Sequence, residues 1–72
     1  MTWEAVLGAN IRRLRKAKGL TQEQLAHEAG MAMRYVAGVE RGEENPSLKF
    51  LVKIAEALAT EPAGLLMRPP TT

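Results

Sequence analysis

LTQEQLAHEAGMAMRYVAGVERG, residues 20–42 of this 72-residue chain, contains the clearest signals of its fold. Thr21 and Gln24 fit a capping box, in which each side chain bonds the free backbone N–H of the other residue at a helix start. Gly30 ends that short helix, and a second short helix begins about three residues later and ends at Gly42. Two short helices joined by a glycine-containing turn predict a helix-turn-helix unit, whose second helix can lie in the major groove of DNA.

Helical patterns continue on both sides of this unit. Before it, apolar residues recur at helical intervals from Trp3 to Leu14. After it, Ser47 caps another helix with one apolar face, and Pro62 suits the first turn of a short fifth helix. No alternating strand pattern competes with these helices. The sequence therefore predicts an all-α fold, a compact five-helix bundle.

The length and composition limit the class of protein. A chain of 72 residues is one small domain, which we assign to residues 1–68, with residues 69–72 as a flexible tail. It contains no cysteine, so it has no disulfide and no thiolate metal site. It begins without a signal-peptide pattern, and its apolar runs are far shorter than the roughly 20 residues that span a bilayer. We expect a cytoplasmic protein that does not enter membranes.

The charge is unevenly distributed along the chain. The formal net charge is +2, but the first 20 residues hold five Lys or Arg residues and one Glu. A basic end can meet a polyanion such as DNA. An ordinary solvated helix face would produce the same pattern, so charge alone does not decide between the two.

The inventory of reactive side chains is poor. The chain has no Asp, and its single Ser and single His cannot build a Ser-His-Asp triad. His27 has no second His or Cys to help it hold a metal. We therefore expect a protein that is not an enzyme, has no cofactor and no metal, and takes no small-molecule substrate.

A helical wheel of residues 32–41 separates a core side from an outer side. The core side holds Ala32, Val36 and Val39, and Met33 and Tyr35 lie at the two edges. The outer side holds Arg34, Ala37, Gly38 and Arg41. Arg34 is the best candidate for reading a base, because arginine bonds guanine O6 and N7 together. Ala37 and Gly38 make a flat patch that would let bases approach closely.

Other polar positions suit the DNA backbone or the core. Gln22 lies in the first turn of a helix, where free N–H groups and the helix dipole favour phosphate. Asn45 and Ser47 offer a second phosphate site at the next helix start, although Ser47 can be a cap and nothing more. Glu40 falls on the inner side of its helix, where a carboxylate needs a partner, and Arg15 is placed to supply it.

The run from Leu7 to Leu66 resembles the phage-repressor, or XRE-type, helix-turn-helix family. The text that carries the resemblance is IRRLRKAKGLTQEQLAHEAG (residues 11–30), VERGEENPSL (39–48) and LVKIAEAL (51–58). The sequence pattern of these segments is similar to that of small standalone regulators of the family, including controller proteins of restriction–modification systems.

The resemblance implies a lambda-repressor-like DNA-binding domain that acts in a bacterial or phage-encoded setting. Its partners would be double-stranded DNA with a palindromic operator and a second copy of the chain. Phosphate contact is implied for Gln22, and we add Tyr35 to the expected phosphate contacts. An ion pair is implied for Arg15 and Glu40. The implied base-facing positions are Met33, Arg34, Ala37 and Gly38.

Departures from the family pattern keep rival functions open. Glu43 and Glu44 stand where basic residues are common, and they would repel phosphate. One rival is a protein-interaction module that has lost specific DNA binding, and another is an antitoxin-type autorepressor with a protein partner. A dimer interface is expected at Leu65, Leu66 and Met67, although these residues could simply close the core.

Overall fold

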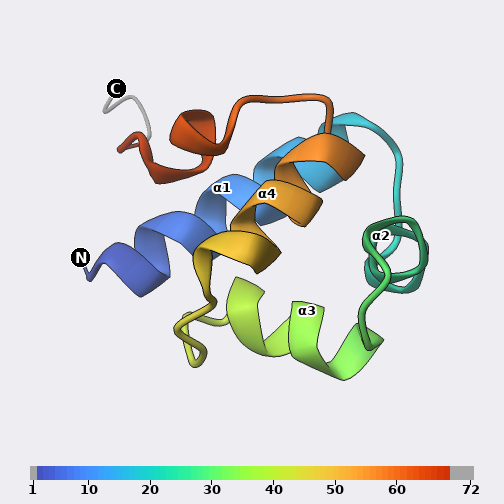
Figure 1. Cartoon of the computed structure of the whole chain (residues 1–72), viewed down its shortest axis with the longest axis horizontal. Helices are drawn as coiled ribbons and strands as arrows, with labels where there is room; N and C mark the ends of the chain where they lie inside the picture. The colour runs from blue at the N-terminus through green and yellow to red at the C-terminus, as the bar shows by residue number, and fades with distance from the viewer. Residues whose placement is uncertain (1, 69–72) are drawn as a thin grey trace.

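The structure is a computed structural model that describes residues 2–68. Over these residues the chain forms helices and no strand (Figure 1). The elements in chain order are α1 (Trp3–Ala17), α2 (Gln22–Ala29), α3 (Met33–Glu40), α4 (Leu48–Ala57) and the 3-10 helix η1 (Pro62–Leu66). The all-α prediction is confirmed. The predicted flexible tail at residues 69–72 lies outside the described residues.

The prediction of five α-helices is wrong, because the fifth segment is a 3-10 helix of five residues. Its sequence is PAGLL, and Pro62 occupies its start. A segment this short cannot complete a stable α-helical nucleus, and Gly64 lowers helix propensity further. The chain therefore makes one tight turn there instead of an α-helix.

The helix boundaries follow the sequence signals. Thr2 and Ser47 cap α1 and α4 through their side-chain oxygens. At α2 the capping box is complete: the Gln24 backbone N–H donates to Thr21 Oγ1 at 3.0 Å, and the Thr21 N–H donates to Gln24 Oε1 at 2.8 Å. Gly30 ends α2 with a φ of 69°, a left-handed conformation that glycine adopts without strain.

The core lies where α1, α2, α3, α4 and η1 meet. Its largest fully buried apolar side chains come from all five elements: Val6, Ile11, Leu25, Val36, Val39, Ile54 and Leu65. Figure 1 shows α2 and α3 on the right and bottom of the molecule, with η1 at the upper left. No helix within residues 2–68 has the length and apolar character that crossing a membrane requires.

Two predicted placements are wrong. Leu65 was expected at a dimer interface, but its side chain is fully buried in the core. Ala32 was expected on the core side of its helix, but it is the exposed N-cap residue of α3, because the helix begins one residue later than the wheel assumed.

Candidate nucleic-acid interface

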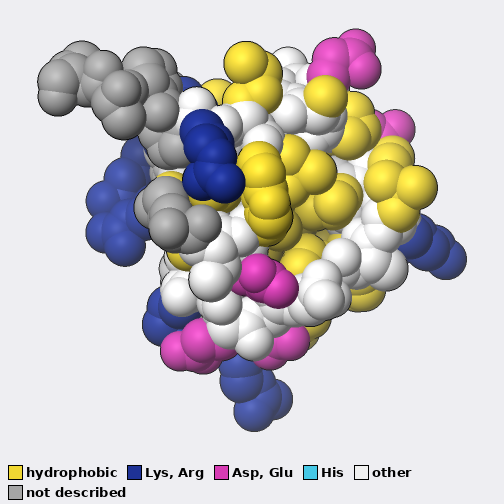
Figure 2. All heavy atoms as spheres, turned by 90° about the vertical axis from the view of Figure 1, so that its left-hand side faces the viewer, with side chains coloured by type: hydrophobic (Ala, Val, Ile, Leu, Met, Phe, Trp, Pro, Cys, Tyr) yellow, Lys and Arg dark blue, Asp and Glu magenta, His cyan; other side chains and the backbone are white. Residues whose placement is uncertain are grey.

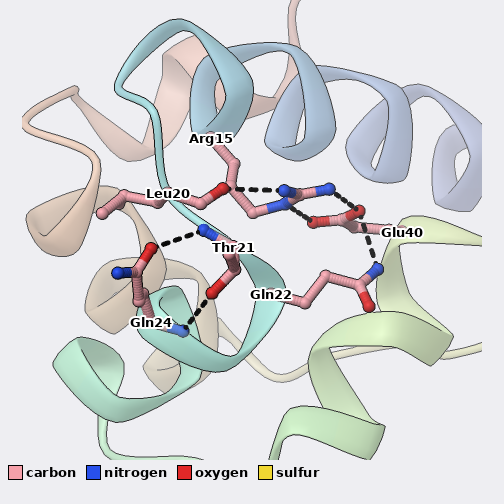
Figure 3. Close-up of polar contacts among 6 residues, drawn as sticks. All are labelled: Arg15, Leu20, Thr21, Gln22, Gln24 and Glu40. Carbon is pink, nitrogen blue, oxygen red and sulfur yellow. Dashed lines mark hydrogen bonds and ion pairs between the residues drawn. The ribbon is translucent and has the colours of Figure 1, made fainter.

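A buried ion pair holds α3 against α1 (Figure 3). Arg15 Nε donates to Glu40 Oε2 at 2.7 Å and Arg15 Nη2 donates to Glu40 Oε1 at 3.0 Å. The two side chains are only 10% and 3% exposed. The hydrogen bond that Arg15 donates to Glu40 raises the pKa of Arg15, against a smaller opposing effect of burial. The expected pair is therefore present, and its bidentate geometry fixes the end of α3.

The same arginine also fixes the connection between α1 and α2. Arg15 Nη1 donates to the backbone carbonyl oxygen of Leu20 at 2.8 Å. Leu20 directly precedes the capping box at Thr21, so the start of α2 is tied to α1 as well (Figure 3). One guanidinium therefore sets the positions of both helices of the α2–α3 unit.

Gln22 is the first residue of α2 and completes this network. Its Nε2 donates to Glu40 Oε1 at 3.1 Å, and the residue is half-buried (Figure 3). The amide thus links the N-terminal end of α2 to the C-terminal end of α3. The sequence did not reveal this bond, because it joins two helices whose separation depends on tertiary packing.

The outer face of α3 is partly open. Arg34 is exposed and Met33 has 48% of its surface exposed, so the first turn of α3 projects both side chains outward. Ala37 is half-buried. These three residues lie at or near the surface, as a helix that contacts bases requires.

Gly38 does not form the expected open patch, because it is buried. A Cβ atom placed on Gly38 would stand 3.1 Å from Glu44 Cγ and 3.3 Å from Glu44 Oε2. The backbone N–H of Glu43 donates to the Gly38 carbonyl oxygen at 3.0 Å, which folds the following turn back over the helix. The Glu44 side chain therefore covers the position, and the sequence showed only that the glycine was unusual there.

Tyr35 lies at the edge of α3 against α4. Its ring stacks on Phe50 with centroids 4.8 Å apart and planes tilted by 39°. Partial burial raises the pKa of Tyr35, and the negative charge of Glu44 raises it further. The phenol is therefore neutral at ordinary pH, with an O–H able to donate a hydrogen bond.

The turn between α3 and α4 carries the remaining polar candidates. Asn45 and Ser47 are both exposed, and the Ser47 hydroxyl already accepts from the Phe50 N–H at 3.4 Å. Arg41 Nε lies 3.0 Å from Glu43 Oε2, which lowers the pKa of the Glu43 carboxyl group. Arg41, the C-cap residue of α3, is therefore paired with an acidic neighbour. Arg34, by contrast, forms no ion pair within residues 2–68.

Residues 2–68 bring together no group of three or more His or acidic side chains that could hold a metal ion.

The chain belongs to the helix-turn-helix family, whose sequence pattern matches residues 11–65. The control protein C.SmaI of Serratia marcescens is 40% identical over 68 residues, which are 94% of this chain and 81% of that protein. The crystal structure of the restriction-modification controller protein C.AhdI from Aeromonas hydrophila matches with a TM-score of 0.84 and 48% identity, covering 86% of this chain and 94% of that chain.

A third similar structure contains nucleic acid. The crystal structure of SinR, a master regulator for biofilm formation, in complex with DNA matches with a TM-score of 0.81 and 37% identity. The match covers 85% of this chain and 98% of that chain. The resemblance noted in the sequence is thereby confirmed. These similar proteins are regulators and controllers, which agrees with the expectation that the chain is not an enzyme.

Proposed function

We propose that this chain is a bacterial transcriptional regulator that binds a palindromic operator in double-stranded DNA as a homodimer, with α3 in the major groove. The observation that carries the proposal is the α2–α3 unit, in which Arg15 bonds Glu40 of α3 and the Leu20 carbonyl before α2 while Arg34 is exposed. The likeness to SinR, which was crystallised with DNA, supports the same use of the unit.

Arg34 has the leading role in reading sequence. Its guanidinium can bond O6 and N7 of one guanine, a contact worth about 1–3 kcal/mol of discrimination. Met33 and Ala37 add apolar surface that can contact a thymine methyl group. Met33 and Arg34 come from the first turn of α3, where a recognition helix of this class makes base contacts, and Ala37 lies one turn later on the same helix.

Contacts with the phosphates of the DNA backbone would set the position of the protein along the duplex. Gln22 lies at the positive end of α2, where free N–H groups favour phosphate. The neutral phenol of Tyr35 can donate to a second phosphate, and Asn45 with the start of α4 near Ser47 can contact a third. Such contacts add affinity that falls with salt and carry no sequence information.

Dimer formation has a physical motive and a surface to support it. One recognition helix reads few base pairs, whereas two half-sites one DNA turn apart add affinity and specificity. Within residues 2–68, the exposed large hydrophobic residues outside α3 are Trp3 (53%), Leu48 (71%), Val52 (38%), Leu66 (40%) and Met67 (67%). Figure 2 looks onto the side that holds the start of α1 and shows hydrophobic side chains gathered at its centre.

Asn10 fixes the part of this surface that η1 contributes. Its side chain is fully buried, and its Nδ2 donates to the carbonyl oxygens of Leu65 at 2.9 Å and Met67 at 2.6 Å. These bonds hold η1 so that Leu65 enters the core while Leu66 and Met67 face outward. We therefore place the dimer interface on Leu66, Met67 and the exposed face of α4, without Leu65.

The test is selection of bound sequences from random duplex DNA at two salt concentrations, with Arg34→Ala beside the wild type. The proposal predicts a palindromic motif. Arg34→Ala should weaken the preference for one guanine in each half-site of that motif. Arg12→Ala, which removes the same charge from an exposed position on α1, should leave the motif unchanged. If no motif emerged and the remaining DNA binding disappeared at moderate salt, the proposal would be contradicted. A protein-interaction module would then be favoured.

A further inference from the structure

The Glu44 side chain comes from the turn after α3 and lies against α3 at Gly38. Arg34 and Gly38 are four residues apart, so they lie one above the other on one stripe of the helix. Gly38 contributes no side chain to that stripe. The Glu44 side chain occupies the space instead, with its Cγ 3.1 Å and its Oε2 3.3 Å from where a Cβ on Gly38 would be.

The ion pairing near the Glu44 carboxylate involves other residues, although the charge of Glu44 adds to the larger effect of Glu43 in raising the pKa of Arg41. Glu43, its neighbour in the chain, is paired with Arg41, whereas no ion pair is formed by Glu44 among the described residues. Glu44 instead lies close enough to Tyr35 for its charge to raise the pKa of the phenol. The stripe that begins with a cation at Arg34 therefore continues with an acceptor-only group one turn later.

We propose that Glu44, although it is not part of α3, is a specificity-determining residue that accepts a hydrogen bond from the exocyclic amino group of a cytosine in the major groove. The inference rests on the proposed function, because it assumes that the Arg34 stripe faces base edges. A carboxylate accepts hydrogen bonds only, and in the major groove the amino donors are cytosine N4 and adenine N6. Glutamate suits cytosine N4, whereas guanine and thymine offer it only acceptors.

The distance along α3 places this base relative to the guanine read by Arg34. Four helical residues rise about 6 Å, and successive base pairs are about 3.4 Å apart along the duplex axis. The cytosine would therefore lie about two base pairs from the guanine in each half-site. The same carboxylate would be repelled by guanine O6 or thymine O4 at that position.

The experiment is the sequence selection with Glu44→Gln and Glu44→Ala, followed by affinities on the wild-type operator and on operators changed at the one position. Wild type should prefer cytosine over the other bases by about tenfold. Glu44→Ala should lose that preference and keep the guanine of Arg34. Glu44→Gln should move the preference to adenine, because an amide can bond adenine N6 and N7 together.

Two further variants distinguish a base contact by Glu44 from a general effect of negative charge near the DNA. Glu43→Ala removes the same charge from the adjacent residue and should leave the preference at the cytosine position unchanged. Gly38→Ala should weaken the preference, because the added Cβ would meet the Glu44 side chain at 3.1 Å and displace it.

The outcomes of the two proposals are distinguishable. If wild type yields no motif, the proposed function fails, and this inference fails with it. If wild type yields a motif and every Glu44 variant keeps the same base preferences while binding all sequences more tightly, only the inference is overturned. Glu44 would then act through repulsion of the phosphate backbone alone, and the role of Arg34 would stand.

Discussion

Gly8 of α1 lies directly against the backbone of Glu40 at the end of α3. A Cβ on Gly8 would stand 2.5 Å from the carbonyl oxygens of both Glu40 and Val39, and 2.8 Å from the Glu40 carbonyl carbon. Such distances are far below van der Waals contact, so only glycine allows the two helices to approach this closely. The position of α3, and therefore of its outer face, depends on this contact.

Gly8→Ala should lower the free energy of unfolding by about 3 kcal/mol, because backbone atoms must move to admit the methyl group. Chemical denaturation followed by far-UV circular dichroism measures the change. Gly38→Ala is the matched control: its methyl group meets only the flexible Glu44 side chain, and helix propensity improves. Equal stability of the two variants would show that the α1–α3 contact is not tight.

The Arg15–Glu40 pair should contribute strongly to stability because both side chains are nearly fully buried. Arg15→Ala and Glu40→Ala should each cost about 3 kcal/mol, since each leaves an uncompensated buried charge. The double variant should cost clearly less than the sum of the single variants. The exposed pair Arg41–Glu43 provides the comparison, and breaking it should leave the denaturation midpoint unchanged. Additive single and double effects would contradict a coupled pair.

Tyr35 is the only tyrosine in the chain, so its titration can be followed alone by tyrosinate absorbance. Its pKa should lie above the ordinary value of about 10, because burial and Glu44 both disfavour the phenolate. The raised folded-state pKa means that stability falls as pH rises through the unfolded value, since the unfolded chain then loses its proton first. Glu44→Gln should lower the pKa only partly, as burial is the larger cause. An unshifted pKa in the folded wild type would contradict this account.

The exposed apolar surface should govern assembly. Leu48→Glu and Met67→Glu should convert the dimer to a monomer while the fold is kept, because both side chains are mostly exposed. Sedimentation equilibrium measures the change, and circular dichroism checks the fold. Met33→Glu, which changes an exposed hydrophobic residue on α3, should leave the dimer intact. The proposed interface is wrong if the first two variants remain dimers or if Met33→Glu is the one that dissociates.

The local signals in the sequence predicted most of the helical framework. The capping box at Thr21, the glycine after α2 at Gly30 and the cap at Ser47 act within a few residues, so their effects are independent of the remaining fold. The α-helix expected after Pro62 was wrong because five residues are too few to form one without support.

The contacts between helices were predictable only in part. The Arg15–Glu40 pair was predicted from the helical wheel of residues 32–41, since a carboxylate on the inner face of a helix needs a cation. Glu44 over Gly38 did not follow, because the path of the turn after α3 decides where that side chain lies. Leu65 and Met67 look alike in the sequence, and only the fold separates a core residue from an exposed one.

The role of Arg34 in reading a guanine from the major groove can be checked by removing one acceptor atom from that base. The selected operator is made with 7-deazaguanine, which lacks the N7 acceptor, at the guanine that Arg34→Ala relaxes. Wild type should bind this operator about tenfold more weakly than the unmodified one, while Arg34→Ala should bind both equally. If both proteins lost the same affinity on the modified operator, or if neither lost any, Arg34 would not contact that base.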